Sequence, residues 1–570
     1  MQGSAVYAVF GKAQRCKYMM NCVEELMKKK LIAMLLTLAI ALSLLAGCGA
    51  VGVVQKPTDG GNVQVGPTDS TKSYITVATW DGGLGSQWLK DAAELFEEMH
   101  KDTSFEEGKK GIDIEVIASR SFDGSAMAYT PLAHDIYFVE AVDYYAMYYN
   151  DQLADITDVI TQPLSDYGDD KTILEKIDPA IEAILNMDDH YYAIPFYESF
   201  YSFAYDLDLW DEKSFYMSAS GGWTDSEGDL SAGPDGENGT GDDGLPATFE
   251  DFGKLITRIK DAGVLPFVCA ANAQDYVANL LYEYWANYEG LEQMMLNYEF
   301  EGTATDLINV DADGNITKLA ETEISFENGY ELQQQAGRYY ALKFCKDILL
   351  SSEENYKIYD THINTQKVFV KGGITNDTPV AMIIEGSWWE NEAKASLEEL
   401  VASGYDRHNY AVMPMPHATA DKIGQKQTWL AMSESYGLIP SSCDSLEPAK
   451  EFMRYLHTDE RLSAFTGETN MTRALNYELL DRDAATISTY AKSILALKEN
   501  GNVIYPYSSI PEVLDNDPLF GAFSWAWLSN INGLEYKSPW IYFLESKGGT
   551  PEEYFAGQKK LFETKWVSLS

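Results

Sequence analysis

The side chains that could do chemistry in this sequence are mainly aromatic rings and carboxylates. Phe, Trp and Tyr make up 13% of the 570 residues, and 88 residues are Asp or Glu. A flat ring can cover the C–H face of a sugar, while a carboxylate can hold its hydroxyl groups. Two carboxylates at a fixed separation can also hydrolyse a glycosidic bond. These residue types therefore leave both carbohydrate binding and carbohydrate hydrolysis open.

Signatures of other catalytic classes are absent from the sequence. It contains no G-x-S-x-G, no H-E-x-x-H and no Cys/His nucleophile motif. Its seven histidines are scattered, and Cys269, Cys345 and Cys443 are widely separated. Neither a disulfide framework nor a paired zinc-site spacing is visible, so we interpret these three thiols as buried. No catalytic residue is assigned.

The sequence around Cys48 indicates a different chemistry, the attachment of a lipid. Three lysines precede a mostly apolar run at 31–46, which is shorter than the roughly 20 residues of a membrane-spanning helix. This layout is typical of a secretory signal peptide. The ending Leu45-Ala46-Gly47-Cys48 resembles a bacterial lipobox, whose cysteine thiol accepts a diacylglycerol and becomes the mature N-terminus. An ordinary signal sequence with an incidental cysteine is the alternative.

The lipobox resemblance divides the N-terminal region into three parts. We expect 1–26 to be an upstream mis-start, 27–47 to be the lipoprotein signal peptide and 48–73 to be a flexible, Gly/Pro/Ser/Thr-rich tether. Lipid on Cys48 would hold the protein on the extracellular face of the bacterial cell membrane.

Charge and length limit what the rest of the chain can do. The formal net charge of −46 repels phosphate backbones, which excludes nucleic acid as a partner. A hydrophobic content of 45% is that of a globular protein. The chain is too long for a single hydrophobic core, so we expect at least two domains.

Hydrophobic patterning after the tether predicts an α/β fold. β-rich runs at 74–80, 112–117 and 135–139 read as strands. Between the first two, helical spacing relates Trp88, Ala92, Leu95, Phe96 and Met99. Strands that alternate with helices indicate βαβ units around a mostly parallel sheet. Capping motifs predict later helices that begin after Thr248 and Thr550.

One acidic insertion could hold a cation. The segment 228–244 is dense in Gly and Asp, and four of its residues carry oxygen ligands suited to Ca²⁺, namely Asp235, Asn238, Asp242 and Asp243. The spacing does not match an EF-hand, and a solvated acidic loop is the alternative. Apart from a structural Ca²⁺, we expect no cofactor.

Several segments, in consistent order, resemble the extracellular solute-binding proteins of carbohydrate ABC importers, the family that includes maltose-binding protein. The segments that carry the resemblance are "ITVATWDG", "DIYFVEAVDYYAMYYNDQLADITDVI", "YYAIPFYESFYSFAYDLDLW", "VFVKGGITNDTPVAMIIEGSWWENE", "YAVMPMP", "PAKEFMRYLHTDE" and "AFSWAWLSN". Each motif alone is loose. Extra material at 217–244, around 291–320 and towards the C-terminus departs from the family pattern.

The resemblance implies a two-lobe periplasmic-binding-protein-like α/β fold, with a hinge and a ligand cleft between the lobes. In such a fold, ligand contacts both lobes only after they close. We expect crossings between the lobes near 200–206, 428–433 and 466–473. The N-terminal lobe would then comprise 74–203 plus 431–469, and the C-terminal lobe 204–430 plus 470–570.

The candidate ligand-binding residues come partly from strand ends and partly from the resemblance. Strand ends in α/β sheets gather ligands, which nominates Trp80, Asp81 and Glu140. By resemblance, Trp388 lies against the sugar and the late aromatic stretch stacks on it. The remaining candidates are Tyr197, Glu198, Tyr276, Glu385, Trp389, Trp525 and Trp527. For each aromatic residue, packing in the core is the alternative.

The resemblance implies a lipid-anchored substrate-binding component that is not an enzyme. It would bind a sugar or oligosaccharide as a monomer and deliver it to ABC permease subunits. Two alternatives stay open: a surface-anchored carbohydrate-active enzyme, or a same-fold binding protein for a peptide or polyol. Stacked tryptophans would favour a sugar, whereas a charged residue that pairs with a chain terminus would favour a peptide.

Overall fold

The computed structural model describes residues 69–566, except 121, 123, 141, 375–377, 432–434, 509, 511–512, 514–536 and 547. The described residues belong to one compact unit, Pro67–Ser570. Within them, no helix has both the length and the apolar content needed to cross a membrane. Cys48, Trp525 and Trp527 lie outside the described residues, so what we expect of them stays a prediction.

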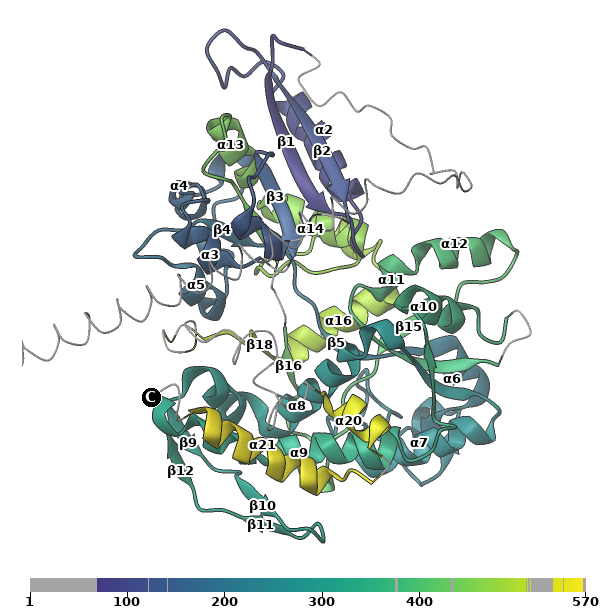
Figure 1. The fold of residues 1–570 in the computed structure, drawn as a ribbon. Coiled ribbons are helices and arrows are strands. Elements are labelled where there is room, and N and C mark those ends of the chain that lie inside the picture. The colour runs from purple at the N-terminus through teal and green to yellow at the C-terminus, as the bar shows by residue number, and fades with distance from the viewer. Residues whose placement is uncertain are drawn as a thin grey trace, which may run out of the picture. The chain divides into compact units, whose positions relative to one another are not determined.

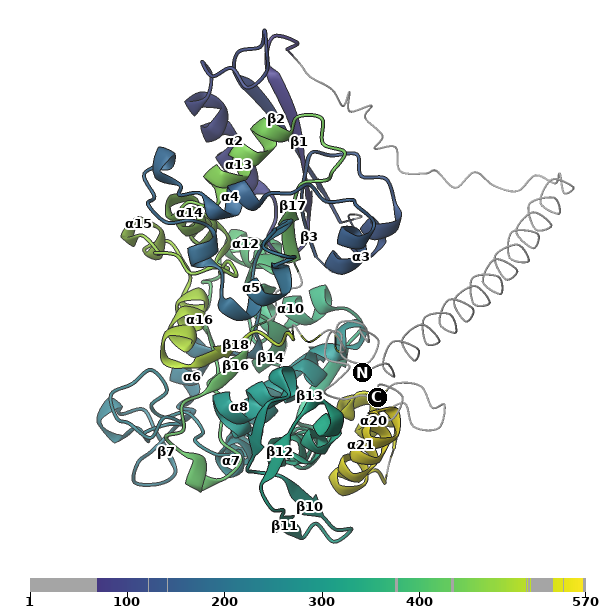
Figure 2. The ribbon, with the colours of Figure 1, turned by 90° about the vertical axis from the view of Figure 1, so that its left-hand side faces the viewer.

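A five-stranded sheet organises the first lobe (Figure 1). Its strands, in spatial order, are β2 (Ile112–Ser119), β1 (Ser73–Trp80), β3 (Ile136–Glu140), β17 (Ser435–Leu438) and β4 (Ala193–Pro195). β1 pairs in parallel with β2 and β3, whereas β17 runs antiparallel to β3 and β4. The three predicted strands are therefore confirmed. β17, from much later in the chain, lies between β3 and β4. Figure 2 shows it, in green, beside β3.

Helix α2 (Gln87–Met99) covers part of this sheet, and the helical spacing predicted for this segment is confirmed. Its buried residues are Trp88, Leu89, Ala92, Ala93 and Phe96, whereas Leu95 and Met99 are 49% and 55% exposed. The helix contacts β2 and α14 (Asp459–Thr469).

A second five-stranded sheet organises the second lobe. Its order is β13 (Tyr356–Tyr359), β8 (Leu265–Ala270), β14 (Val380–Gly386), β5 (Tyr201–Asp206) and β15 (Tyr410–Val412). β8 is parallel to β13 and β14, while β5 is antiparallel to β14 and β15. This mixture again departs from a mostly parallel sheet.

The helices of the second lobe include the two predicted from capping motifs. Thr248 accepts a hydrogen bond from the Asp251 N–H at the start of α7 (Phe249–Asp261). Thr550 accepts one from the Glu553 N–H at the start of α21 (Pro551–Trp566). α8 (Asp275–Glu299) contacts β5 and β14, and α10 (His362–Lys371) contacts β8 and β14. In Figure 1, α21, drawn in yellow, lies along α9 (Ala336–Lys343), which it contacts.

Three segments join the two sheets. Residues 196–200 join β4 to β5, so the expected boundary at 203/204 falls inside β5. The second link lies between β16 (Thr428–Leu430), which contacts α8, and β17. α15 (Asp481–Ala484) packs on α14, and α16 (Thr489–Asn500) packs on β15. The third link therefore lies at 485–488 and not at the expected 466–473.

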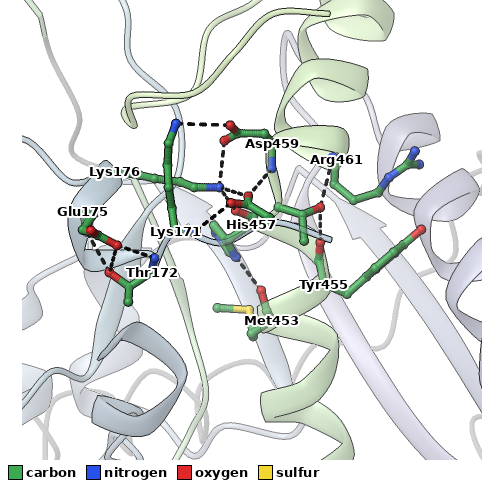
Figure 3. A network of polar contacts seen from close by, with 11 residues as sticks. Lys171, Thr172, Glu175, Lys176, Met453, Tyr455, His457, Asp459 and Arg461 are labelled. Atoms are coloured by element: carbon green, nitrogen blue, oxygen red, sulfur yellow. Dashed lines mark hydrogen bonds and ion pairs between the residues drawn. The ribbon is translucent and has the colours of Figure 1, made fainter. Parts of the chain in front are cut away.

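Buried Lys176 holds the late helices of the first lobe to its earlier loops (Figure 3). Its Nζ lies 2.5 Å from Asp169 Oδ2 and 2.8 Å from Asp459 Oδ1, and it donates to the His457 carbonyl at 2.9 Å. Burial raises the pKa of Asp169, but hydrogen bonds from Lys176 and from the Asp459 and Lys171 N–H groups bring that pKa below its ordinary value. Asp169 thus stays ionised beside the ammonium group.

We expect Lys176→Met to lower the free energy of unfolding by about 3–5 kcal/mol, because it leaves two shielded carboxylates without their cation. Lys171 is the matched control: it lies 3.3 Å from the same Asp459 but is 52% exposed. Lys171→Met should cost no more than about 1 kcal/mol. Urea denaturation of the two variants measures the difference, and equal losses would contradict a structural role for Lys176.

Candidate ligand-binding site

Trp388 stands at the centre of an aromatic group at the end of β14. It is half-buried, and its ring centroid lies 5.5 Å from that of Tyr201 and 5.6 Å from that of Tyr276, with interplanar angles of 88° and 79°. Tyr201 begins β5 and Tyr276 lies in the first turn of α8. The indole also lies over Gly386, where a Cβ would come within 2.2 Å of the ring. Only glycine permits this approach.

Polar groups next to Trp388 are incompletely paired. Gln366 Nε2 on α10 donates to Glu385 Oε1 at 3.3 Å and to Glu392 Oε2 at 2.9 Å. Glu385 Oε2 and Gln366 Oε1 are buried, and neither has a hydrogen-bond partner within the described part of the chain. Native proteins rarely leave such atoms unpaired, which makes both atoms candidates for bonding a ligand.

The Glu385 carboxyl favours its protonated form. Burial raises its pKa well above the ordinary value, and repulsion from Glu392 raises it further, against hydrogen bonds from Gln366 and the Gly386 N–H. A protonated carboxyl can donate as well as accept a hydrogen bond. Glu385 and Gln366 together therefore offer both kinds of partner to a hydroxyl group.

The first lobe and the first link also contribute to this site. The Tyr197 hydroxyl donates to Glu140 at the end of β3. Burial raises the pKa of Tyr197, and the charge of Glu140 raises it further. A Cβ on Gly83, which follows β1, would lie 3.1 Å from the Trp388 Cβ and 3.0 Å from the Glu392 Cγ. Gly83, after β1, therefore meets residues that follow β14, and the end of β3 meets the first link.

Trp80 and Asp81 lie at the end of β1 and are both half-buried. The Trp80 ring folds over Gly82, where a Cβ would be only 1.6 Å from it. The Asp81 carbonyl accepts a hydrogen bond from Arg120 Nε at 3.0 Å. Both residues thus belong to the loop that places Gly83 against Trp388.

Two sequence candidates are internal and do not face a ligand. Trp389 is fully buried, and its ring packs against those of Phe369, Tyr410 and Tyr490. Glu198 is also fully buried, and its carboxylate accepts from the Lys498 ammonium group and, at 2.6 Å, from the Tyr505 hydroxyl. Their expected ligand contacts are therefore wrong: one residue is core and the other fixes the first link.

Sequence reasoning missed Tyr201, Gln366 and Glu392. Glu392 carried a usable signal, because it lies four residues after Trp388 in a helical turn and so shares its face. Tyr201 is one of several tyrosines in its segment. Gln366 lies on a helix whose pattern does not mark it, so no local signal distinguishes either residue.

The carboxylates of the 228–244 loop accept hydrogen bonds from within that loop. Asp235 Oδ1 accepts from the Glu237 N–H, Asp242 Oδ2 from the Asp235 N–H, and Asp243 Oδ2 from the Gly239 N–H. Asn238 is exposed. The cluster of potential metal ligands found among the described residues is a different one, formed by Asp206, Asp208 and His408. These bonds leave acceptor sites on the same carboxylates, since an ionised carboxylate has about four.

The calcium expectation stays a prediction. A chelator should then lower the melting temperature, and added Ca²⁺ should restore it, because an ion bound only by the folded state stabilises that state. Thermal melts with and without the chelator decide this, and an unchanged melting temperature would remove Ca²⁺ from the loop.

Comparisons with known proteins show similarity in structure but not in sequence. No family model matches the sequence, and no curated protein does. The GacH receptor of Streptomyces glaucescens, determined without ligand and with acarbose, matches with a TM-score of 0.51 at 14% identity, over 87% of this chain and 99% of that one. The SBP RafE in complex with raffinose matches with a TM-score of 0.51 at 11% identity, over 86% and 99%.

These matches show the fold. The chain has the two-lobe α/β architecture of these binding proteins, which confirms the predicted fold class. The share of the chain that aligns is large, so the resemblance is not restricted to one lobe.

We expect the free energy of unfolding of Glu385→Gln to fall less steeply with rising pH than that of the wild type. The folded state keeps the Glu385 proton above the ordinary glutamate pKa of about 4.3, so the wild type loses stability as pH increases through and beyond that value. Gln cannot ionise and removes this loss. Denaturation from about pH 5 to about pH 8 should show the shallower slope.

Glu399→Gln is the control, because Glu399 is 61% exposed and its ion pair with Lys371 lowers its pKa. This variant should not flatten the slope. If Glu385→Gln and the wild type have identical pH profiles, Glu385 ionises freely and is not a donor.

Proposed function

We propose that this protein is the extracellular substrate-binding component of an ABC importer and binds an oligosaccharide between its two lobes. The fold supports this, since similar structures are described as a receptor in complex with acarbose and a protein in complex with raffinose. Those ligands belong to those proteins. For this chain, the proposal depends on the site itself.

The observation that carries the proposal is the combination at Trp388 of a half-buried indole with buried polar atoms that have no partner in the described part of the chain. Trp388 and half-buried Tyr276 supply apolar surface for the C–H side of a sugar ring, and buried Tyr201 packs edge-on against Trp388. Glu385 Oε2 and Gln366 Oε1 supply a donor and an acceptor for its hydroxyl groups. Few other ligand classes require both over the area of one ring.

Ligand binding would be coupled to lobe closure, because the site draws on both sheets. Glu140 and Gly83 follow strands of the first sheet, whereas Glu385 and Trp388 belong to β14 and its end. A sugar that contacts both groups stabilises only the arrangement in which they are close. Micromolar affinity, about −8 kcal/mol, is within reach of a few stacked rings and hydrogen bonds after the costs of ordering.

Lipid anchoring at Cys48 and delivery to permease subunits complete the proposal. A tether from a lipidated N-terminus would keep the binding protein near the membrane while its lobes open and close. We propose that it acts as a monomer and that permease subunits accept the closed form.

Two other functions remain to be distinguished by experiment. A surface carbohydrate-active enzyme would release products when incubated with an oligosaccharide, whereas a binding protein would return it intact. A peptide-binding protein of the same fold needs a charged partner for a chain terminus. Around Trp388, the described side chains with hydrogen-bonding groups include Glu385, Gln366 and Glu392, which can bond hydroxyl groups; a carboxylate such as Glu392 could also pair with an amino terminus, so titration with peptides separates the two.

We expect one class of neutral oligosaccharide to raise the melting temperature of the wild type, because it binds the folded state only. Trp388→Ala should lose this shift, and its affinity should fall at least about a hundredfold, since the central stacking surface is gone. Calorimetric titration with malto-, chito- and raffinose-series sugars measures the affinity.

The matched control is Trp389→Phe, which alters the adjacent but buried indole. It should lower stability by about 1–3 kcal/mol through imperfect core packing and leave affinity nearly unchanged. If Trp388→Ala binds as tightly as the wild type, the site is elsewhere. If the purified protein cleaves the sugar, it is an enzyme.

A further inference from the structure

Two carboxylates at the proposed site lie close together without a positively charged partner. Glu385 is on β14, and Glu392 ends α11 (Trp389–Glu392). Gln366 Nε2 donates to both of them, at 3.3 Å and 2.9 Å. Among the described residues, the basic side chain in ion-pair range of these carboxylates is that of His362, whose Nε2 lies 3.9 Å from Glu392 Oε1.

His362 supplies a hydrogen bond to this pair but no charge. Asn272 Oδ1 accepts the backbone N–H of His362 at 2.9 Å, which turns Asn272 Nδ2 towards His362 Nδ1 at 3.1 Å. An amide nitrogen can only donate, so Nδ1 accepts and the imidazole is neutral. The segments between 69 and 546 that lie outside the described residues contain no Lys, Arg or His. The two carboxylates are therefore not balanced by an ion pair in the described part of the chain.

Each of these acids raises the energy of the other's ionised form. Burial raises the pKa of Glu385, and repulsion from Glu392 raises it further. Burial also raises the pKa of the Tyr276 hydroxyl, and the charges of Glu385 and Glu392 add to this effect. In the free protein, Glu385 limits the repulsion by keeping its proton. A positively charged ligand group would limit it in another way, since Glu385 could then release its proton to water and ionise. An uncharged hydroxyl group does not supply the positive charge that this requires.

The carboxylates lie beside aromatic rings. A Cβ on Gly83 would come within 3.1 Å of the Trp388 Cβ and 3.0 Å of the Glu392 Cγ, so these two side chains are neighbours. The ring centroid of Tyr276 is 5.6 Å from that of Trp388. The face of an aromatic ring, and of an indole in particular, attracts a cation. A positively charged group held by Glu392 would thus lie next to ring surface that also favours it.

The acceptors at the site outnumber the donors of a single hydroxyl group. Glu385 and Gln366 are each 1% exposed, and Glu385 Oε2 and Gln366 Oε1 have no hydrogen-bond partner in the described part of the chain. Once Glu385 is ionised, both atoms accept, as do the remaining lone pairs of Glu392. A hydroxyl group donates one hydrogen bond, whereas an ammonium group donates three. An ammonium group therefore matches this set of acceptors better.

We propose that the sugar bound at Trp388 carries a basic nitrogen, so that the ligand is an amino sugar whose ammonium group is held by Glu385 and Glu392. This inference rests on the proposed function and narrows its substrate class. A neutral sugar of the same shape fits the site but binds more weakly, because hydrogen bonds between charged groups are the stronger ones. The net charge of −46 also favours a cationic ligand, since it attracts cations towards the protein.

The test is calorimetric titration of the wild type at about pH 6, where a sugar amine is protonated. The ligands are three β-1,4-linked oligosaccharide series that differ only at carbon 2, which bears an amine (glucosamine), a hydroxyl (glucose) or an acetamide (N-acetylglucosamine). Galactosamine and galactose form a second pair. We expect an amino sugar to bind at least about tenfold more tightly than its hydroxyl or acetamide counterpart.

Glu392→Gln removes one negative charge and keeps the shape of the side chain. It should bring the ratio of the affinities for the amino and the hydroxyl sugar to within about twofold, because the partner of the ammonium group becomes neutral. Glu399→Gln is the matched control: it makes the same change of charge at a side chain that is 61% exposed and pairs with Lys371. This variant should keep the wild-type ratio.

Each other outcome has a distinct meaning. If a neutral sugar binds the wild type as tightly as its amino counterpart, the amino-sugar inference is wrong and the proposed function stands. If Glu392→Gln keeps the preference for the amine, the assignment of the ammonium group to Glu385 and Glu392 is wrong. If short peptides with a free amino terminus bind and no sugar does, both the inference and the proposed function are wrong. If neither sugars nor peptides bind, the proposed function fails first.

Discussion

The connection between the two lobes of this protein depends on the partners of the buried Glu198 carboxylate. Glu198 lies in the first link, is fully buried, and accepts bonds from Lys498 of α16 and from Tyr505, which follows β18 (Asn502–Ile504). A buried carboxylate without such partners costs several kcal/mol, so the link cannot move away from them cheaply. Lys498 lies in α16, which follows the third link. Its interaction with Glu198 therefore holds the first link against the segment that follows the third link.

A second buried carboxylate acts similarly at the second link. Glu283 on α8 accepts from the Leu430 N–H at 2.7 Å, at the end of β16, and burial raises its pKa well above the ordinary value. Glu198 and Glu283 thus flank the segments on which the site is built, because Tyr197 precedes Glu198 and Tyr201 begins the next strand. The positions of Tyr197 and Tyr201 follow from the anchoring of their neighbours.

Local patterns in the sequence predicted the elements but not the partners of individual side chains. Strands 74–80, 112–117 and 135–139 and the caps at Thr248 and Thr550 depend on residues close in sequence, and all are present. Trp388 and Trp389 show the limit of prediction from local sequence. They are adjacent and identical, yet one lies over Gly386 and the other among Phe369, Tyr410 and Tyr490. That difference arises from packing between distant segments, as does the burial of Glu198.

The state of each polar group before binding decides which contacts contribute to affinity. The Tyr197 hydroxyl already donates to Glu140, so a sugar hydroxyl that bonds Glu140 exchanges one hydrogen bond for another and gains little. Glu385 Oε2 and Gln366 Oε1 have no partner in the described part of the chain, so a sugar hydroxyl that reached them would gain a hydrogen bond without breaking one within the protein. Specific recognition should therefore be concentrated at β14 and α10 in the second lobe. Under the proposed function, the first lobe would contribute mainly by covering the sugar once it is held.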